Sequence, residues 1–176
     1  MQKGIYVSLG SNVGDRANHL RKAIVRLESA GRVVSVSSFY ETAPVEVTNQ
    51  PWFLNCVVEL ETAQTPEKLL QAVLVIEREM GRRRTRSKGP RIVDLDILLF
   101  GDTVMDSPKL IIPHPAMHER RFVLEPLAEI APDARHPVLQ KTVRELLKTL
   151  PVGQVVRRIA ANDWGKEGKK ESTTNL

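Results

Sequence analysis

The chain has 176 residues, of which 41% are hydrophobic and 27% charged, as in ordinary soluble globular proteins. It is long enough for one domain with a proper core, and it contains no apolar run of membrane-spanning length. Its first apolar segment is interrupted at Ser8 and Gly10, so neither a membrane helix nor a signal peptide is expected. Cys56 is the single cysteine, which excludes an internal disulfide, and we expect a cytoplasmic protein.

The net charge of +5 is concentrated in one segment. Residues 82–91 carry six positive and no negative side chains, so the rest of the chain has a net charge of −1. A patch this compact suits a multiply charged small ligand, such as a nucleoside triphosphate, at least as well as a polymer backbone.

The N-terminal third predicts a strand, a turn and a helix. Residues 4–9 are typical of a buried strand, and the small and polar residues 10–15 can cap the helix that follows, which ends near Gly31. The turn could cradle phosphate, but it lacks the Lys-Ser/Thr of a P-loop and the third glycine of a dinucleotide fingerprint. We favour the structural interpretation. The apolar stripe of the helix is Leu20, Ala23, Ile24 and Leu27.

Two further strands, 32–39 and 53–60, are predicted on either side of a long connection. A loop of this length inside a compact domain is often part of a binding site. Trp52 and Phe53, beside Asn55, offer a stacking surface and an amide suited to a flat heterocycle. Alternatively, Phe53 and Asn55 merely share a solvent-lined face, and residue types alone do not decide between the two.

A second helix is predicted from Thr65 and Pro66 to the stop at Gly81. We interpret Glu77 as lying on a different face from Val73, directed toward a groove rather than the core. The apolar stripe is Leu69, Val73, Ile76 and Met80.

The basic segment runs directly into residues 92–100, an apolar stretch with strand character that contains Asp94 and Asp96. Side chains alternate along a strand, so both carboxylates share one face, with Cα atoms about 6–7 Å apart. Magnesium usually takes one or two carboxylates and fills its other positions with water and substrate phosphates. The alternative is a polar strand edge whose aspartates pair with the loop arginines, and ion pairing can coexist with metal binding.

The last third predicts a rigid segment, two helices and a tail. His114 lies between Pro113 and Pro115, which would hold its imidazole in place, although a structural or exposed histidine is the more common case. A helix is expected from residue 120 to residue 130, and a capping box at residues 142–145 starts a second one. Beyond Pro151 the periodicity fades, and we expect a mostly disordered tail to Leu176.

Taken together, these stretches resemble the 6-hydroxymethyl-7,8-dihydropterin pyrophosphokinase family (2-amino-4-hydroxy-6-hydroxymethyldihydropteridine diphosphokinases). The resemblance extends from residue 5 to about residue 135, and its most specific part is the Gly-Pro-Arg to Asp-Leu-Asp segment. The matching stretches are residues 9–12, 38–42, 50–55, 81–82, 89–96, 113–115 and 120–122.

The resemblance implies a folate-biosynthesis enzyme that transfers pyrophosphate from ATP to the hydroxymethyl group of the pterin and leaves AMP. It also implies two magnesium ions held by Asp94 and Asp96, and a ferredoxin-like α+β fold. In this fold, an α/β/α sandwich, a central antiparallel sheet carries long lid loops. Residues 1–160 would form the pyrophosphokinase domain and residues 161–176 a disordered tail.

The resemblance also implies three groups of site residues. The catalytic residues would be Arg82, Arg91, Asp94 and Asp96. Pterin would be bound by Thr42, Ala43, Val45, Phe53, Asn55 and Phe122. ATP would be bound by Leu70, Glu77, Arg82, Arg84, Arg91, Ile97, Lys109, Leu110, His114 and Arg120.

Three positions depart from patterns of the family and bear on lid closure and nucleotide affinity. Lys88 stands where some members have Trp, Phe53 where others have Tyr, and Pro115 where a Tyr can follow the histidine. An RNA-binding module is a rival interpretation, but aromatic content is 5% and no stacking motif occurs on a predicted strand. A homologue without catalysis would not need the Asp and Arg set. We therefore expect an enzyme acting on small molecules as a monomer, without nucleic-acid or membrane partners.

Overall fold

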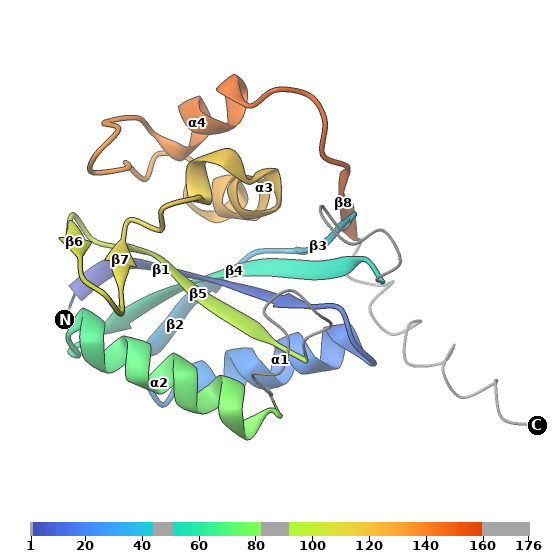
Figure 1. The fold of residues 1–176 in the computed structure, drawn as a ribbon, viewed down its shortest axis with the longest axis vertical. Coiled ribbons are helices and arrows are strands. Elements are labelled where there is room, and N and C mark those ends of the chain that lie inside the picture. Colours follow the sequence, from blue (N-terminus) through green and yellow to red (C-terminus); the bar gives the residue numbers. More distant parts are fainter. Residues whose placement is uncertain (1, 44–50, 82–91, 160–176) are drawn as a thin grey trace, which may run out of the picture.

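The computed structural model describes residues 2–43, 51–81 and 92–159. Its centre is an antiparallel sheet with the strand order β5-β1-β4-β3-β8, in which β2 also pairs with β4. Helices α1 and α2 cover one face of the sheet, and α3 and α4 lie on the other face (Figure 1). The sheet strands are β1 (Gln2–Ser11), β2 (Arg32–Val36), β3 (Phe39–Thr42), β4 (Phe53–Thr62), β5 (Asp94–Phe100) and β8 (Val156–Ile159).

The helices begin where their capping residues predict. Asp15 accepts a hydrogen bond from the Asn18 backbone at the start of α1, and Thr65 caps α2 ahead of Pro66. Thr142 accepts from the Glu145 backbone and starts α4. The helices are α1 (Arg16–Leu27), α2 (Pro66–Glu79), α3 (Arg121–Ile130) and α4 (Val143–Thr149); a 3-10 turn η1 (Met117–Glu119) and the hairpin of β6 (Met105–Asp106) and β7 (Ile111–Ile112) complete the described part.

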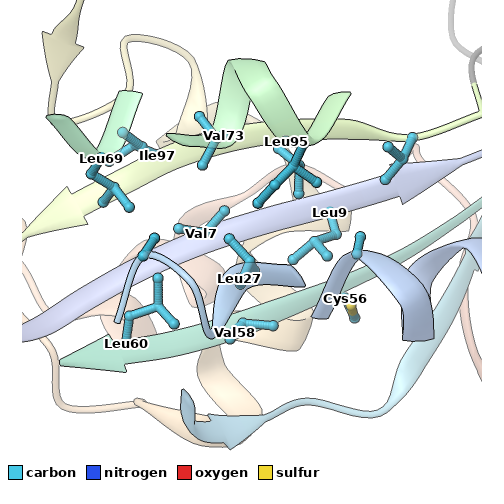
Figure 2. Packing of buried hydrophobic residues seen from close by; sticks show 14 of the residues in the cluster. Val7, Leu9, Leu27, Cys56, Val58, Leu60, Leu69, Val73, Leu95 and Ile97 are labelled. Carbon is cyan, nitrogen blue, oxygen red and sulfur yellow. The ribbon is translucent and has the colours of Figure 1, made fainter. Parts of the chain in front are cut away.

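Two apolar clusters hold these layers together, one on each face of the sheet. The first lies between the sheet and α1 and α2, where leucine and valine side chains of the strands meet those of the helices (Figure 2). The second lies under α3 and α4 and includes Tyr6, Val57, Leu98 and Leu99 from the sheet. Within the three described stretches, no helix is both long and apolar enough to cross a membrane.

Three local expectations were wrong. The strand predicted over 32–39 is interrupted at Ser37 and Ser38, because Ser37 Oγ accepts from the Val57 backbone and the Ser38 backbone donates to Glu129 of α3, at 2.5 Å. Residues 156–159 of the expected tail form β8, which pairs with β3. Glu77, expected on a different face from Val73, lies on the same face as that residue four positions earlier. Glu77 is only 2% exposed.

Candidate active site

The two aspartates lie on the face of β5 that is turned away from α1 and α2. Asp94 pairs with Gly10 and Asp96 with Ser8 on β1, whereas the intervening Leu95 belongs to the cluster under α1 and α2. The predicted shared face is therefore confirmed by the strand register. Both carboxylate residues are half-buried, which makes them accessible to a ligand while they are held on a regular strand.

Asn55 and Thr42 form a buried polar pair on the next strands of the sheet. Asn55 Nδ2 donates a hydrogen bond of 3.0 Å to Thr42 Oγ1, and the two residues are 7% and 2% exposed. Phe53 is half-buried two residues before Asn55 and pairs directly with Thr42. These three predicted pterin residues are thus brought together, and Ala43 follows Thr42 directly, with its backbone N–H bonded to Val155 O.

Gly10 connects the aspartate and asparagine parts of the site. In the register of the sheet, it pairs with Asn55 on one side and with Asp94 on the other. A Cβ atom added at Gly10 would lie 2.9 Å from Asn55 Oδ1, so the amide lies directly over the glycine. Our sequence interpretation treated Gly10 as the start of a turn and missed this role, because strand register depends on residues far apart in the chain.

His114 is fixed beside the aspartates by two backbone contacts. Its own N–H donates to Leu98 O at 2.9 Å, and its Nδ1 accepts from the Ala116 backbone at 3.1 Å. The proton of the neutral ring is therefore on Nε2, where it can be donated to a ligand. Burial and the neighbouring Arg120 guanidinium lower the pKa of His114 to about 4, although Asp94 acts in the opposite direction.

Phe122 and Arg120 lie at the start of α3. The Arg120 guanidinium carbon lies 5.6 Å from the centroid of the Phe122 ring, within the range of a cation–π contact. Arg120 also acts on the pKa of His114, so these side chains belong to the same neighbourhood as Asp94.

Three of the predicted ATP-binding residues lie on the other side of β5. Ile97 and Leu110 belong to the cluster that α2 covers, and Leu70 of α2 packs against it. Glu77 is buried along the same helix, and Lys109 is exposed. Because β5 is the end strand of the sheet order, side chains from both of its faces can reach a ligand that lies along its outer edge. Four predicted site residues, Val45, Arg82, Arg84 and Arg91, lie outside the described residues.

The carboxylate pair fits a hard cation such as magnesium. Two oxygen-ligand residues are the number that magnesium usually takes from a protein. Their cross-strand neighbours on β1 are Gly10 and Ser8, neither of which carries a bulky side chain. Among the residues that the structure describes, no third His, Cys, Asp or Glu joins them in a metal-binding group. The remaining positions would be filled by water and substrate phosphates.

The model of one protein family, described as 7,8-dihydro-6-hydroxymethylpterin-pyrophosphokinase (HPPK), matches residues 6–132. This chain belongs to that family. The match confirms the resemblance deduced from the motifs at residues 9–12, 89–96 and 113–115.

Curated relatives agree with the family match. The Bacillus subtilis 2-amino-4-hydroxy-6-hydroxymethyldihydropteridine pyrophosphokinase is 50% identical over 127 residues, which cover 71% of this chain and 76% of the relative. The enzyme of the same name from Methylorubrum extorquens is 43% identical over 154 residues, 86% of this chain and 96% of the relative. The folic acid synthesis protein fol1 of Schizosaccharomyces pombe is 45% identical over 148 residues, 83% of this chain but 20% of fol1.

The fold is also shared with solved structures. A crystal structure of Plasmodium falciparum HPPK-DHPS with pteroate has a TM-score of 0.69 at 17% identity and covers 84% of this chain. The matched part is 44% of that longer chain, so the present chain spans under half of it. The likeness confirms the ferredoxin-like α+β class with its central antiparallel sheet.

Proposed function

We propose that this chain transfers the pyrophosphoryl group of ATP to 6-hydroxymethyl-7,8-dihydropterin and forms AMP and the pterin diphosphate. Family membership supports the reaction. The structural observation that carries the proposal is the row Asn55–Gly10–Asp94 across three strands, which combines a buried amide, a residue without a side chain and a carboxylate. Adjacent strands lie about 4.8 Å apart, so the ends of this row are separated by about 10 Å. A flat heterocycle with a hydroxymethyl arm can bridge that span.

The amide end of the row would bind the pterin. The Asn55 side chain both donates and accepts, as the edge of a pterin requires, and Thr42 fixes its orientation. Phe53 and Phe122 would stack on the two faces of the ring, and backbone groups at Ala43 and Val45 would complete the edge contacts.

The carboxylate end would bind the metal and the triphosphate. Asp94 and Asp96 would hold two magnesium ions, which when bound neutralise the phosphates and make the pterin hydroxyl more acidic. His114 would donate from Nε2 to a phosphate oxygen, and Arg120 would pair with the same triphosphate. Arg82 and Arg91 would neutralise charge on the transferring group.

The remaining ATP contacts would come from the outer edge of β5. Lys109 and Arg84 would contribute positive charge, and Glu77 would contact ATP from α2. Leu70, Ile97 and Leu110 would contact adenine. We further propose a cytoplasmic monomer that acts on small molecules, with residues 1–160 as its catalytic domain.

A magnesium-dependent assay with ATP and the reduced hydroxymethylpterin tests the proposal when AMP and ADP are separated among the products. AMP that forms only with pterin and magnesium supports pyrophosphoryl transfer. ADP would indicate an ordinary kinase on this fold, and a chain that forms no nucleotide product would contradict the proposal.

The Arg82→Ala variant tests the role of the basic segment in the same assay. Its kcat should fall far more than its affinity for ATP, because a group that neutralises transition-state charge contributes little to ground-state binding. A normal kcat with weaker ATP binding would assign Arg82 to docking of the nucleotide.

A further inference from the structure

Arg16 makes two contacts that meet beside the proposed pterin pocket. It is the first residue of α1, and its Nη1 donates to the Trp52 carbonyl at 2.7 Å. Its Nη2 donates to Glu41 Oε1 at 2.8 Å, and the two side chains are 14% and 13% exposed. A single guanidinium thus connects the N-terminus of a helix to two strands.

The two acceptors are the immediate neighbours of two pterin residues. Glu41 precedes Thr42 at the end of β3, and Trp52 precedes Phe53 at the start of β4. Thr42 and Phe53 are themselves a cross-strand pair. The Arg16 side chain therefore joins both strand ends at the position where the two pterin residues face each other.

Glu41 is held as a carboxylate between two arginines. Its second oxygen pairs with Arg157 of β8, in addition to the contact with Arg16. Burial acts to raise the pKa of Glu41, but the hydrogen bonds from Arg16 and Arg157 lower it below its ordinary value. The ionised form makes both contacts charge-assisted, and such hydrogen bonds are about twice as strong as neutral ones.

The position of Arg16 in α1 does not favour the helix itself. The first turn of a helix carries the positive end of the dipole, where acidic residues are stabilising and cations are not. The first turn of α1 contains no acidic residue. By contrast, Arg26 lies in the last turn of the same helix, where a cation is favourable, and pairs with Glu79 at 2.9 Å. The contacts with Glu41 and Trp52 account for an arginine at the unfavourable end.

We propose that Arg16 is a positioning residue for pterin binding, which it serves by fixing the two strand ends that carry Thr42 and Phe53. This inference rests on the assignment of these two residues to the pterin pocket. It concerns the pterin, since the two hydrogen bonds of Arg16 described above are to Glu41 of β3 and to Trp52 at the start of β4.

The Arg16→Lys variant tests the proposal, because lysine keeps the charge but its single ammonium lacks the planar fork that reaches two separate acceptors. We expect kcat/KM for the pterin to fall about tenfold while KM for ATP stays within twofold. Arg26→Lys, in the same helix and also ion-paired, is the matched control and should change neither constant by more than about twofold. The melting temperature of each variant is measured alongside.

An Arg16→Lys variant whose kcat/KM for the pterin is unchanged would overturn the proposal. Equal losses of kcat/KM for the pterin and for ATP would also overturn it. A lower melting temperature with normal pterin kinetics would show that the contact is merely structural. Glu41→Gln provides a second test if the lysine variant does not fold, and it should shift the pterin constant in the same direction by a smaller factor. Absence of AMP formation by the wild-type chain would contradict the proposed function instead.

Discussion

The two faces of the central sheet differ in composition at neighbouring positions. Where β1 ends and β4 and β5 begin, the face toward α1 and α2 is apolar and closed, whereas the α3 side carries a glycine, an amide and a half-buried carboxylate. The contrast is visible between adjacent residues on β1, β4 and β5. The pairs, apolar residue first, are Leu9 with Gly10, Cys56 with Asn55, and Leu95 with Asp94.

Within a single strand, residues that stabilise the fold therefore alternate with residues of the candidate site. The apolar side chains hold the strands in register, and the alternation of the strand directs the next residue to the opposite face. Substitutions one position apart should therefore affect different properties.

The largest effect is expected for Asp96→Ala. The variant should lose about a thousandfold or more in kcat, because the metal and the triphosphate lose a ligand. Its free energy of unfolding should stay within about 1 kcal/mol of the wild-type value, since the side chain is only half-buried. AMP formation and urea denaturation measure the two properties. A variant that does not fold would contradict the assignment of Asp96 to chemistry rather than to stability.

The adjacent Leu95→Ala should show the opposite pattern. Leu95 is 4% exposed in the cluster under α1 and α2, and truncation of such a leucine costs about 2–5 kcal/mol. At a temperature where the variant is still folded, its kcat should remain within a few-fold of the wild-type value. A large loss of kcat in the folded variant would show that the two faces are not independent.

Gly10→Ala should impair pterin binding selectively. The new Cβ would lie 2.9 Å from Asn55 Oδ1 and displace the amide, so we expect KM for the pterin to rise about tenfold with little change for ATP. Gly153→Ala is the control, because a Cβ at Gly153 meets no atom within 4 Å. Equal effects of the two substitutions on pterin kinetics would rule out the proposed contact.

The smallest expected effect is on the pH dependence of stability, and it concerns His136, between α3 and α4. Burial and the nearby His118 lower the pKa of His136, whose Nδ1 accepts from the Val138 and Leu139 backbones. The unfolded chain therefore binds a proton more readily, and stability is lost as pH falls below about 6.5. The loss from this group is at most about 1.4 kcal/mol per pH unit.

The His136→Asn variant tests this titration. The asparagine Oδ1 can replace Nδ1 as an acceptor, and the asparagine side chain does not titrate in this pH range. Unfolding by urea at pH 7.5 and pH 5.5 should show a smaller difference for the variant than for the wild-type chain. An equal or larger difference would assign the acid sensitivity to other groups.

Local patterns in the sequence predicted much of this molecule. Capping residues and apolar periodicity located α1, α2 and α4, and alternation placed Asp94 and Asp96 on one face, because these features depend on residues only a few positions apart. Glu77 was misplaced because it was assigned to a different face from Val73, although its spacing of four from Val73 puts it on the buried stripe.

The parts that the sequence did not reveal depend on contacts between distant residues. Strand β8 exists because Val156 and Ile159 are half-buried against β3, while Arg157 reaches Glu41 and Arg158 reaches Glu129. Gly10 gains its role only when β4 and β5 are placed on either side of β1. Arg16 alone offered a local signal, as a cation in the first turn of a helix.

The central strand β1 also determines when the active site can form during protein synthesis. It is complete at Ser11, but its partner β5 ends at Phe100 and the strand that supplies Arg157 ends at Ile159. At about 5–20 residues per second, translation takes several seconds or more to supply these partners. Until then a nascent chain has β1 without its full set of neighbours, and it exposes strand edges that can pair with other chains. Ribosome-bound fragments that end before Asp94 therefore lack the carboxylate half of the candidate site altogether.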